Sequence, residues 1–186
     1  MIPKIFHRTV PPGPIPEKYE KYWRTFQWLH PDWKFLTHFG GNIFMSDQVR
    51  LLALIHYGGI YVDWDIQPLR SWEPLLDYKG FAARDKGGIV MNAVMGAVPN
   101  HPAMEECLRL SVAVCAAGGS VQDAGCGVTE AILSNRDDWT LLPTHYFYPY
   151  DWQELERAGE DFSAIPDCYG VHHWATAWSK DCKAGQ

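Results

Sequence analysis

The 186-residue sequence lacks any apolar run of the roughly eighteen residues needed to cross a bilayer, and residues 1–10 lack the apolar core of a signal peptide. It also lacks a basic stretch longer than a few residues, and 16 Lys and Arg against 22 Asp and Glu give a formal net charge of -6. Such a chain has no electrostatic footprint for a nucleic-acid backbone. We therefore expect a cytoplasmic protein with no membrane span and no nucleic-acid partner.

Cysteine pairs with the spacing of a metal or redox motif are absent. The five cysteines form no C-x-x-C pair, and an odd number cannot be fully paired within one chain, so we expect free thiols. Internal repeats and low-complexity linkers are also absent. Hydrophobic residues (47%) and charged residues (20%) stand near the averages for soluble globular proteins, which excludes disordered and fibrous classes. The length predicts a single domain, 1–186.

Strand and helix signals alternate along the chain. Proline residues between 11 and 16 force a turn after a first strand, Ser46 is the expected N-cap of a helix, and Gly58-Gly59 ends that helix. The next segment, 60–62, is uniformly apolar, which indicates a parallel strand covered on both sides. This alternation predicts an α/β sandwich. The predicted strands are 3–9, 33–37, 60–62, 81–84, 89–94, 140–142 and 169–173, and the predicted helices are 17–29, 46–57, 102–117 and 129–133.

Two acids, Asp63 and Asp65, stand at the end of the buried strand. Side chains two apart on an extended chain point to the same side, so both carboxylates are predicted to face one point. Two like charges this close repel by about 1 kcal/mol in water and by more in a partly dry cleft. A hard divalent cation, Mg²⁺ or Mn²⁺, relieves that repulsion and prefers oxygen ligands. The alternative is a solvated junction with two ordinary acids.

The stretch 46–65, Ser-Asp-Gln-Val-Arg through Gly-Gly-Ile-Tyr-Val-Asp-Trp-Asp, resembles the core signature of glycosyltransferase family 32. Residues 2–9 (IPKIFHRT) look like that family's opening strand, 91–93 with 99–102 are similar to its middle segment, and 171–178 resemble its closing motif. The resemblance implies a nucleotide-sugar-binding sandwich of the GT-A type, with a mostly parallel central sheet flanked by helices. It also implies retaining transfer of a hexose or N-acetylhexosamine from a UDP- or GDP-sugar.

The same resemblance implies roles for individual residues. Asp65 would ligate the metal, Asp63 would lie near the donor sugar or ribose, and Asp47 and Arg50 would contact the donor's sugar and phosphate. Positions three apart share a helix face, so an ordinary Asp47–Arg50 ion pair is the alternative. We predict as catalytic residues Asp47, Arg50, Asp63 and Asp65; as donor-binding residues Phe6, His7, Asp47, Arg50, Asp63, Asn92 and Trp178; and as metal ligands Asp63, Asp65 and His172.

The end of the chain holds two adjacent histidines and a candidate lid. Neighbouring strand residues point to opposite faces, so one of His172 and His173 would reach a metal. The family motif places its histidine six residues before the final tryptophan, Trp178, which selects His172; a structural histidine is the alternative. Trp178 matches a tryptophan that closes over the donor diphosphate in this family, although Thr176-Ala177 departs from the usual small residue and serine. We expect a flexible tail from about Trp174.

Two other functions use the same residues. A metal-dependent nucleotide-sugar hydrolase or phosphodiesterase would employ Asp63, Asp65 and His172, and a catalytically silent module would bind the nucleotide sugar without turnover. No pair resembles the nucleophile and acid/base carboxylates of glycosidases, so family analogy favours front-face substitution. The predicted partners are a nucleotide-sugar donor and a glycan, protein or lipid-linked acceptor.

Overall fold

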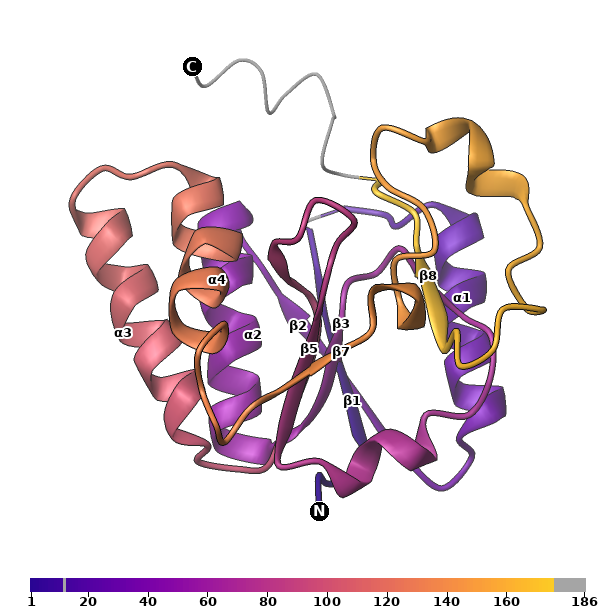
Figure 1. The fold of residues 1–186 in the computed structure, drawn as a ribbon, viewed down its shortest axis with the longest axis horizontal. Helices are drawn as coiled ribbons and strands as arrows, with labels where there is room; N and C mark the ends of the chain where they lie inside the picture. Colours follow the sequence, from indigo (N-terminus) through magenta and orange to yellow (C-terminus); the bar gives the residue numbers. More distant parts are fainter. Residues whose placement is uncertain (12, 176–186) are drawn as a thin grey trace.

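The protein, described here by a computed structural model at residues 1–11 and 13–175, is an α/β sandwich built on a six-stranded sheet (Figure 1). The β1–β2, β1–β3 and β5–β7 pairs are parallel, whereas β6 runs antiparallel to both β3 and β5. The predicted mostly parallel sheet is therefore confirmed. In spatial order the strands are β2 (Lys34–Phe39), β1 (Ile5–Val10), β3 (Gly59–Val62), β6 (Val90–Ala97), β5 (Gly80–Arg84) and β7 (Thr140–Leu142).

Helices cover both faces of this sheet (Figure 1). On one face α1 (Glu17–Leu29) buries Trp23 and Phe26 in the core that contains Phe6, and on the other face α2 packs against α3, which in turn packs against α4. Strand β3 alternates between the two cores, with Ile60 on the α1 side and Tyr61 on the α2 side. The expectation that this strand is covered on both sides is confirmed. The helices of the second face are α2 (Ile43–Tyr57), α3 (Pro102–Ala116) and α4 (Val128–Leu133).

The start of α2 differs from the prediction. The N-cap is Asn42, whose side chain accepts a hydrogen bond from the Met45 amide (2.8 Å), so Ser46 lies one turn inside the helix. Asparagine and serine cap helices equally well, which is why the sequence alone misplaced this boundary. The predicted stop is confirmed, since Gly58 has a φ of 61°. A Cβ on Gly59 would lie 2.5 Å from the Ile5 carbonyl oxygen, so only glycine lets the chain turn there directly into β3.

A small second sheet brings the end of the described chain back to β3. Strands β4 (Ile66–Pro68) and β8 (Gly170–His172) pair antiparallel, with Ile66 opposite His172. Trp174, where the flexible tail was expected to begin, is 5% exposed and donates its indole N–H to the Tyr150 carbonyl (3.3 Å). The remainder of that expectation, 176–186, lies outside the described residues. Short helical turns fill the connections at Glu73–Asp77, Asp123–Gly127, Thr144–Tyr146 and Leu155–Gly159.

Two further expectations concern thiols and membranes. The four cysteines within the described residues are all free, and the fifth, Cys182, lies outside them. Among the described helices, none is both long enough and apolar enough to cross a bilayer.

The imidazole of His7 makes fold stability depend on pH. His7 is fully buried on β1, with Nε2 2.8 Å from the Gly58 carbonyl oxygen, and burial lowers its pKa to about 4. In the unfolded chain the pKa is about 6.5, so between pH 6.5 and 4 only the unfolded state takes up the proton. We expect His7 to remove about 2 kcal/mol of unfolding free energy when the pH falls from 7.5 to 5.0. Urea unfolding of wild type and His7→Gln at both pH values checks this; equal pH dependence in the two proteins would contradict it.

Candidate active site

Two carboxylates converge just beyond the end of β3. The Asp63 amide donates to the Ala93 carbonyl (2.8 Å), which continues the strand pairing with β6, and the chain then turns so that the Ile66 amide reaches the Asp63 carbonyl (3.1 Å). Asp63 and Asp65 are therefore joined by a turn, and the extended geometry predicted for them is wrong. Their convergence nevertheless holds. Potential ligand atoms of Asp63, Asp65 and His172 all lie within 4.8 Å of one another.

Asp65 and His172 form a buried pair. His172 Nε2 lies 3.4 Å from Asp65 Oδ1, and Asp65 Oδ2 accepts a hydrogen bond from the Ala175 amide (2.7 Å). Burial opposes charge on both groups, yet the His172 charge holds the pKa of Asp65 below its usual value. Likewise, although burial lowers the pKa of His172, the Asp65 carboxylate raises it above its usual value. Each partner thus stabilises the charged form of the other.

His173 turns away from the carboxylates, as strand alternation predicted. Its Nδ1 lies 3.0 Å from the Tyr150 hydroxyl, and its Nε2 lies 2.9 Å from Gln67 Oε1 and 3.2 Å from the Tyr22 hydroxyl. The ring also stacks on Tyr22 with centroids 5.3 Å apart. His173 therefore serves packing and hydrogen bonding, and His172 is the histidine that the structure brings to the site.

The cluster has the composition of a divalent-metal site. Asp65 Oδ1 is buried without a hydrogen-bond partner, which is costly unless a cation or proton occupies the space beside it. Adjacent oxygen and nitrogen ligands of an octahedral Mn²⁺ or Mg²⁺ are about 3 Å apart, close to the 3.4 Å between Asp65 Oδ1 and His172 Nε2. Asp63, Asp65 and His172 consequently fit the predicted metal.

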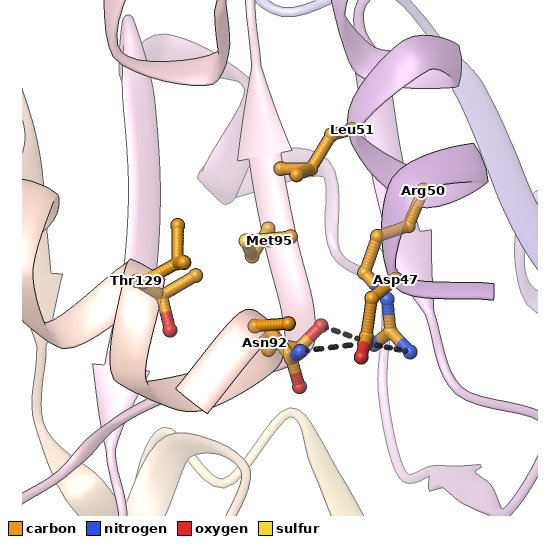
Figure 2. A pocket seen from close by; sticks show the side chains of 9 residues that line it. Asp47, Arg50, Leu51, Asn92, Met95 and Thr129 are labelled. Atoms are coloured by element: carbon orange, nitrogen blue, oxygen red, sulfur yellow. Dashed lines mark hydrogen bonds and ion pairs between the residues drawn. The ribbon is translucent and has the colours of Figure 1, made fainter. Parts of the chain in front are cut away.

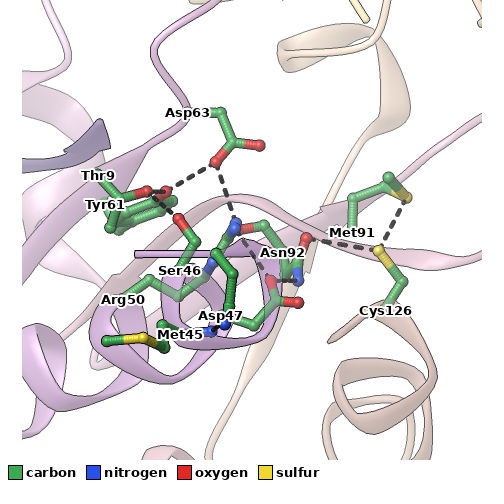
Figure 3. A network of polar contacts seen from close by, with 11 residues as sticks. Thr9, Met45, Ser46, Asp47, Arg50, Tyr61, Asp63, Met91, Asn92 and Cys126 are labelled. Carbon is green, nitrogen blue, oxygen red and sulfur yellow. Dashed lines mark hydrogen bonds and ion pairs between the residues drawn. The ribbon is translucent and has the colours of Figure 1, made fainter. Parts of the chain in front are cut away.

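The guanidinium of Arg50 connects α2 to this cluster (Figure 3). Its Nη2 lies 3.0 Å from Asp47 Oδ1, and its Nη1 donates to Asp63 Oδ1 (3.1 Å) and to the Asn92 carbonyl (2.8 Å). The group also lies 4.6 Å from the ring centroid of Tyr61. Burial opposes the charge, but Asp63 and its neighbours raise the pKa of Arg50 above its usual value. The Asp47–Arg50 ion pair therefore exists, as one part of a larger buried network.

Burial raises the pKa of both Asp47 and Asp63 even though Arg50 lowers it. Hydrogen bonds moderate the effect. Asn92 Nδ2 donates to Asp47 Oδ1 (2.9 Å), and the Tyr61 hydroxyl donates to Asp63 Oδ1 (2.8 Å). Burial also raises the pKa of Tyr61 well above its ordinary value, so its phenol remains a donor.

A small pocket opens beside Asp47, with about 10 Å³ of space, roughly what one water molecule occupies (Figure 2). Gly125, in the turn before α4, closes it from the other side: a Cβ there would lie 2.9 Å from Asp47 Oδ2 and 3.0 Å from Asn92 Nδ2. The structure thus places predicted donor-binding residue Asn92 with Asp47 and Arg50. The pocket is lined by Asp47, Arg50, Leu51, Asn92, Met95, Ala124, Gly125, Val128 and Thr129.

Two predicted donor-binding residues, Phe6 and His7, lie away from the carboxylate cluster. Phe6 is fully buried and stacks on Trp33 with centroids 4.7 Å apart, and His7 faces the Gly58 carbonyl. Within the described residues, neither side chain forms a hydrogen bond or ion pair with the carboxylate cluster, so their donor role stays a prediction. Trp178 lies outside the described residues.

Tyr61 is the site residue that the sequence analysis missed. It looked like one member of an apolar strand, but it stands two positions before Asp63 and therefore on the same face of β3. That spacing was the available signal. The partners of its hydroxyl are Thr9 on β1 and Asp63 just after β3, and the proximity of Thr9 depends on the fold.

Comparisons with known proteins agree with this geometry. Residues 20–82 match the family described as the glycosyltransferase sugar-binding region containing the DXD motif. The chain is 33% identical over 130 residues to inositol phosphoceramide mannosyltransferase 3 of Schizosaccharomyces pombe, covering 58% of this chain and 36% of that protein. It is 30% identical over 131 residues to mannosyl phosphorylinositol ceramide synthase SUR1 of Saccharomyces cerevisiae, covering 59% and 34%. The resemblance to Asp-x-Asp glycosyltransferases is confirmed.

The solved structure of the PaToxG glycosyltransferase is similar in fold, with a TM-score of 0.61 and 18% identity over 70% of this chain and 67% of that one. The predicted glycosyltransferase-type sandwich is confirmed. The matched region spans about a third of the length of the two yeast relatives.

Removing the Arg50 charge leaves two carboxylates without their cation. We expect Arg50→Met to lower the unfolding free energy by about 3 kcal/mol at pH 7.5, since breaking a buried ion pair strands the partner. The pKa values of Asp47 and Asp63 then rise further in the folded state. As the pH falls, the folded state therefore binds protons at a higher pH than the unfolded state, and the loss of unfolding free energy caused by the substitution is smaller at pH 5.5 than at pH 7.5. Denaturant unfolding at both pH values measures this. The matched control, Arg24→Met at an exposed pair with Glu17, should change stability by less than about 0.5 kcal/mol.

The two histidines should differ in metal binding. His172→Gln is expected to weaken Mn²⁺ binding by more than about tenfold, because it removes a ligand, and His173→Gln should leave it within about threefold. Calorimetric titration with Mn²⁺ in the presence of nucleoside diphosphate compares the two variants. A larger loss of Mn²⁺ affinity in His173→Gln than in His172→Gln would show that His173 is the ligand and would contradict the assignment to His172.

Proposed function

We propose that this chain is a metal-dependent glycosyltransferase domain that transfers a hexose from a nucleotide diphosphate sugar to an acceptor. The observation that carries the proposal is the cluster of Asp63, Asp65 and His172 at the end of β3. Its setting supports the assignment, because the cluster lies in a glycosyltransferase-type fold and Asp63 and Asp65 fall within the matched sugar-binding region.

The cluster would hold Mn²⁺ or Mg²⁺, and a bound cation stabilises the negative charge that grows on a departing diphosphate. The protein's own charges favour an anionic donor. Arg50 offsets part of the charge on the carboxylates of Asp47 and Asp63, and the bound cation would offset that of Asp65. Without these partners, three carboxylates would repel the phosphates that the site is proposed to receive.

Asp47 and Asn92 are proposed to contact the donor sugar. Their carboxylate and amide groups, hydrogen-bonded to each other at 2.9 Å, border the small pocket from α2 and from β6. Hydroxyl groups of a sugar form hydrogen bonds with both kinds of group. We place the sugar of the donor at the mouth of this pocket.

We further propose retention of configuration through a front-face substitution. The acceptor oxygen forms the new bond to the sugar carbon, the bond from that carbon to the phosphate oxygen breaks, and the acceptor's proton passes to the leaving phosphate. Arg50 engages Asp47 and Asp63, and the proposed cation would engage Asp63 and Asp65, which supports this route because none of the three would be left as a free nucleophile.

The names of the similar yeast proteins suggest the first substrates to test. Since they are mannosyltransferases of inositol phosphoceramide, we propose a mannosyl donor, presented as a GDP-sugar, and a lipid-linked acceptor. UDP-hexoses and UDP-N-acetylhexosamines are the comparison donors.

Asp65→Asn tests the function. Because Asp65 offers its unpartnered Oδ1 to the cation, we expect this variant to lose at least about 100-fold of Mn²⁺-dependent transfer while remaining folded. The assay measures product from GDP-mannose with lipid-linked and free glycan acceptors, with Mn²⁺ or with chelator. Asp32→Asn, at an exposed pair with Lys4, is the matched control and should retain activity. Hydrolysis of the donor without transfer, or binding without turnover, would contradict the proposed reaction.

A further inference from the structure

A chain of three hydroxyl groups leads from α2 through β1 and β3 to Asp63 (Figure 3). Ser46 Oγ donates to Thr9 Oγ1 at 2.6 Å, the hydroxyls of Thr9 and Tyr61 are 2.7 Å apart, and the Tyr61 hydroxyl donates to Asp63 Oδ1 at 2.8 Å. Ser46 and Thr9 are not among the residues that line the small pocket or form the metal cluster. By hydrogen bonds within the described residues, Thr9 reaches Asp63 through Tyr61, and Ser46 reaches it through Thr9 and Tyr61.

Counting protons fixes the direction of every bond in this chain. An ionised carboxylate can only accept hydrogen bonds, so Tyr61 must donate its single hydroxyl proton to Asp63. The bond between Thr9 and Tyr61 must then carry the proton of Thr9, and the bond between Ser46 and Thr9 must carry that of Ser46. All three bonds therefore point toward Asp63, the arrangement in which hydrogen bonds strengthen one another.

The chain is held in place by its surroundings. Thr9 is 4% exposed and Tyr61 is fully buried, so neither hydroxyl has water as a ready substitute. Behind Ser46 the backbone of Gly40 comes so close that a Cβ there would lie 2.8 Å from Ser46 Oγ. Glycine at position 40 thus leaves the space that the serine hydroxyl occupies when it bonds to Thr9.

The chain of hydroxyl groups also makes the two carboxylate oxygens of Asp63 different from each other. Oδ1 accepts hydrogen bonds from both Tyr61 and Arg50, whereas Oδ2 accepts none from the described part of the chain. We propose that Thr9 and Ser46 are positioning residues that hold Asp63 through Tyr61, with Oδ1 engaged and Oδ2 left for the divalent cation. This inference rests on the proposed function, because the cation is the one that the transferase would require.

Paired variants of Thr9 test the inference without any turnover. Thr9→Val keeps the shape and removes the hydroxyl, and we expect it to weaken Mn²⁺ binding about fivefold, the value of one hydrogen bond. Thr9→Ser restores the hydroxyl and should bind within about twofold of wild type. Ser46→Ala breaks the next link and should weaken binding by a similar factor. Two matched controls, Thr37→Val on β2 and Ser111→Ala on α3, remove hydroxyls outside the chain and should leave the affinity unchanged.

The deciding titrations are calorimetric, with Mn²⁺ alone. Wild-type affinity in a folded Thr9→Val protein, or an equal loss in Thr9→Ser, would overturn the positioning role while leaving the proposed function standing. Failure of wild type itself to bind Mn²⁺ would overturn the proposed function and the cation part of the inference together.

A metal-free measurement tests the hydroxyl chain separately. Within the described residues, hydrogen bonds link Thr9 to Asp63 through Tyr61. A double-mutant cycle of Thr9→Val and Asp63→Asn, read from the folding equilibrium constant, should therefore show coupling of about threefold or more. Additive effects, which a packing role of Thr9 would give, would overturn the chain whether or not the protein binds a metal.

Discussion

The buried ion pair that Arg50 makes with Asp47 and Asp63 is the interaction on which the rest of the site depends. Burying an unpaired carboxylate costs several kcal/mol, and a third acid, Asp65, lies close by. The single positive charge of Arg50 is shared between Asp47 and Asp63, and a protonated His172 pairs with Asp65, so the group keeps a net negative charge. The result is a concentrated set of oxygen ligands that the fold can tolerate before any cation binds, and Asp65 Oδ1 makes no hydrogen bond within the described residues.

The topology of the sheet explains how these groups meet. Helix α2 carries Asp47 and Arg50 and passes through two glycines directly into β3, so both ends of the network come from one continuous segment. The antiparallel neighbour β6 supplies Asn92, and the small β4–β8 sheet returns His172 from the far end of the chain (Figure 1). The end of β3 is the point at which these segments converge, and this convergence defines the proposed transfer site.

Local patterns in the sequence predicted much of the fold, including the helix Glu17–Leu29 and the strand Thr140–Leu142 at their observed bounds. The motif around Asp63 identified the site, and alternation along a strand separated His172 from His173. The sequence did not reveal that β6 runs antiparallel, because strand order depends on distant pairings. The same reason hid the hydroxyls of Thr9 and Ser46, which approach Tyr61 only in the folded chain.

Anomalous diffraction from crystals soaked with Mn²⁺ and a nucleoside diphosphate tests the central claim most directly. The account predicts one strong manganese peak in contact with Asp65, His172 and Asp63, with Arg50 still bonded to Asp63 and the diphosphate bound to the metal. A manganese ion bound elsewhere, or a diphosphate bound with no metal between it and these three residues, would contradict it.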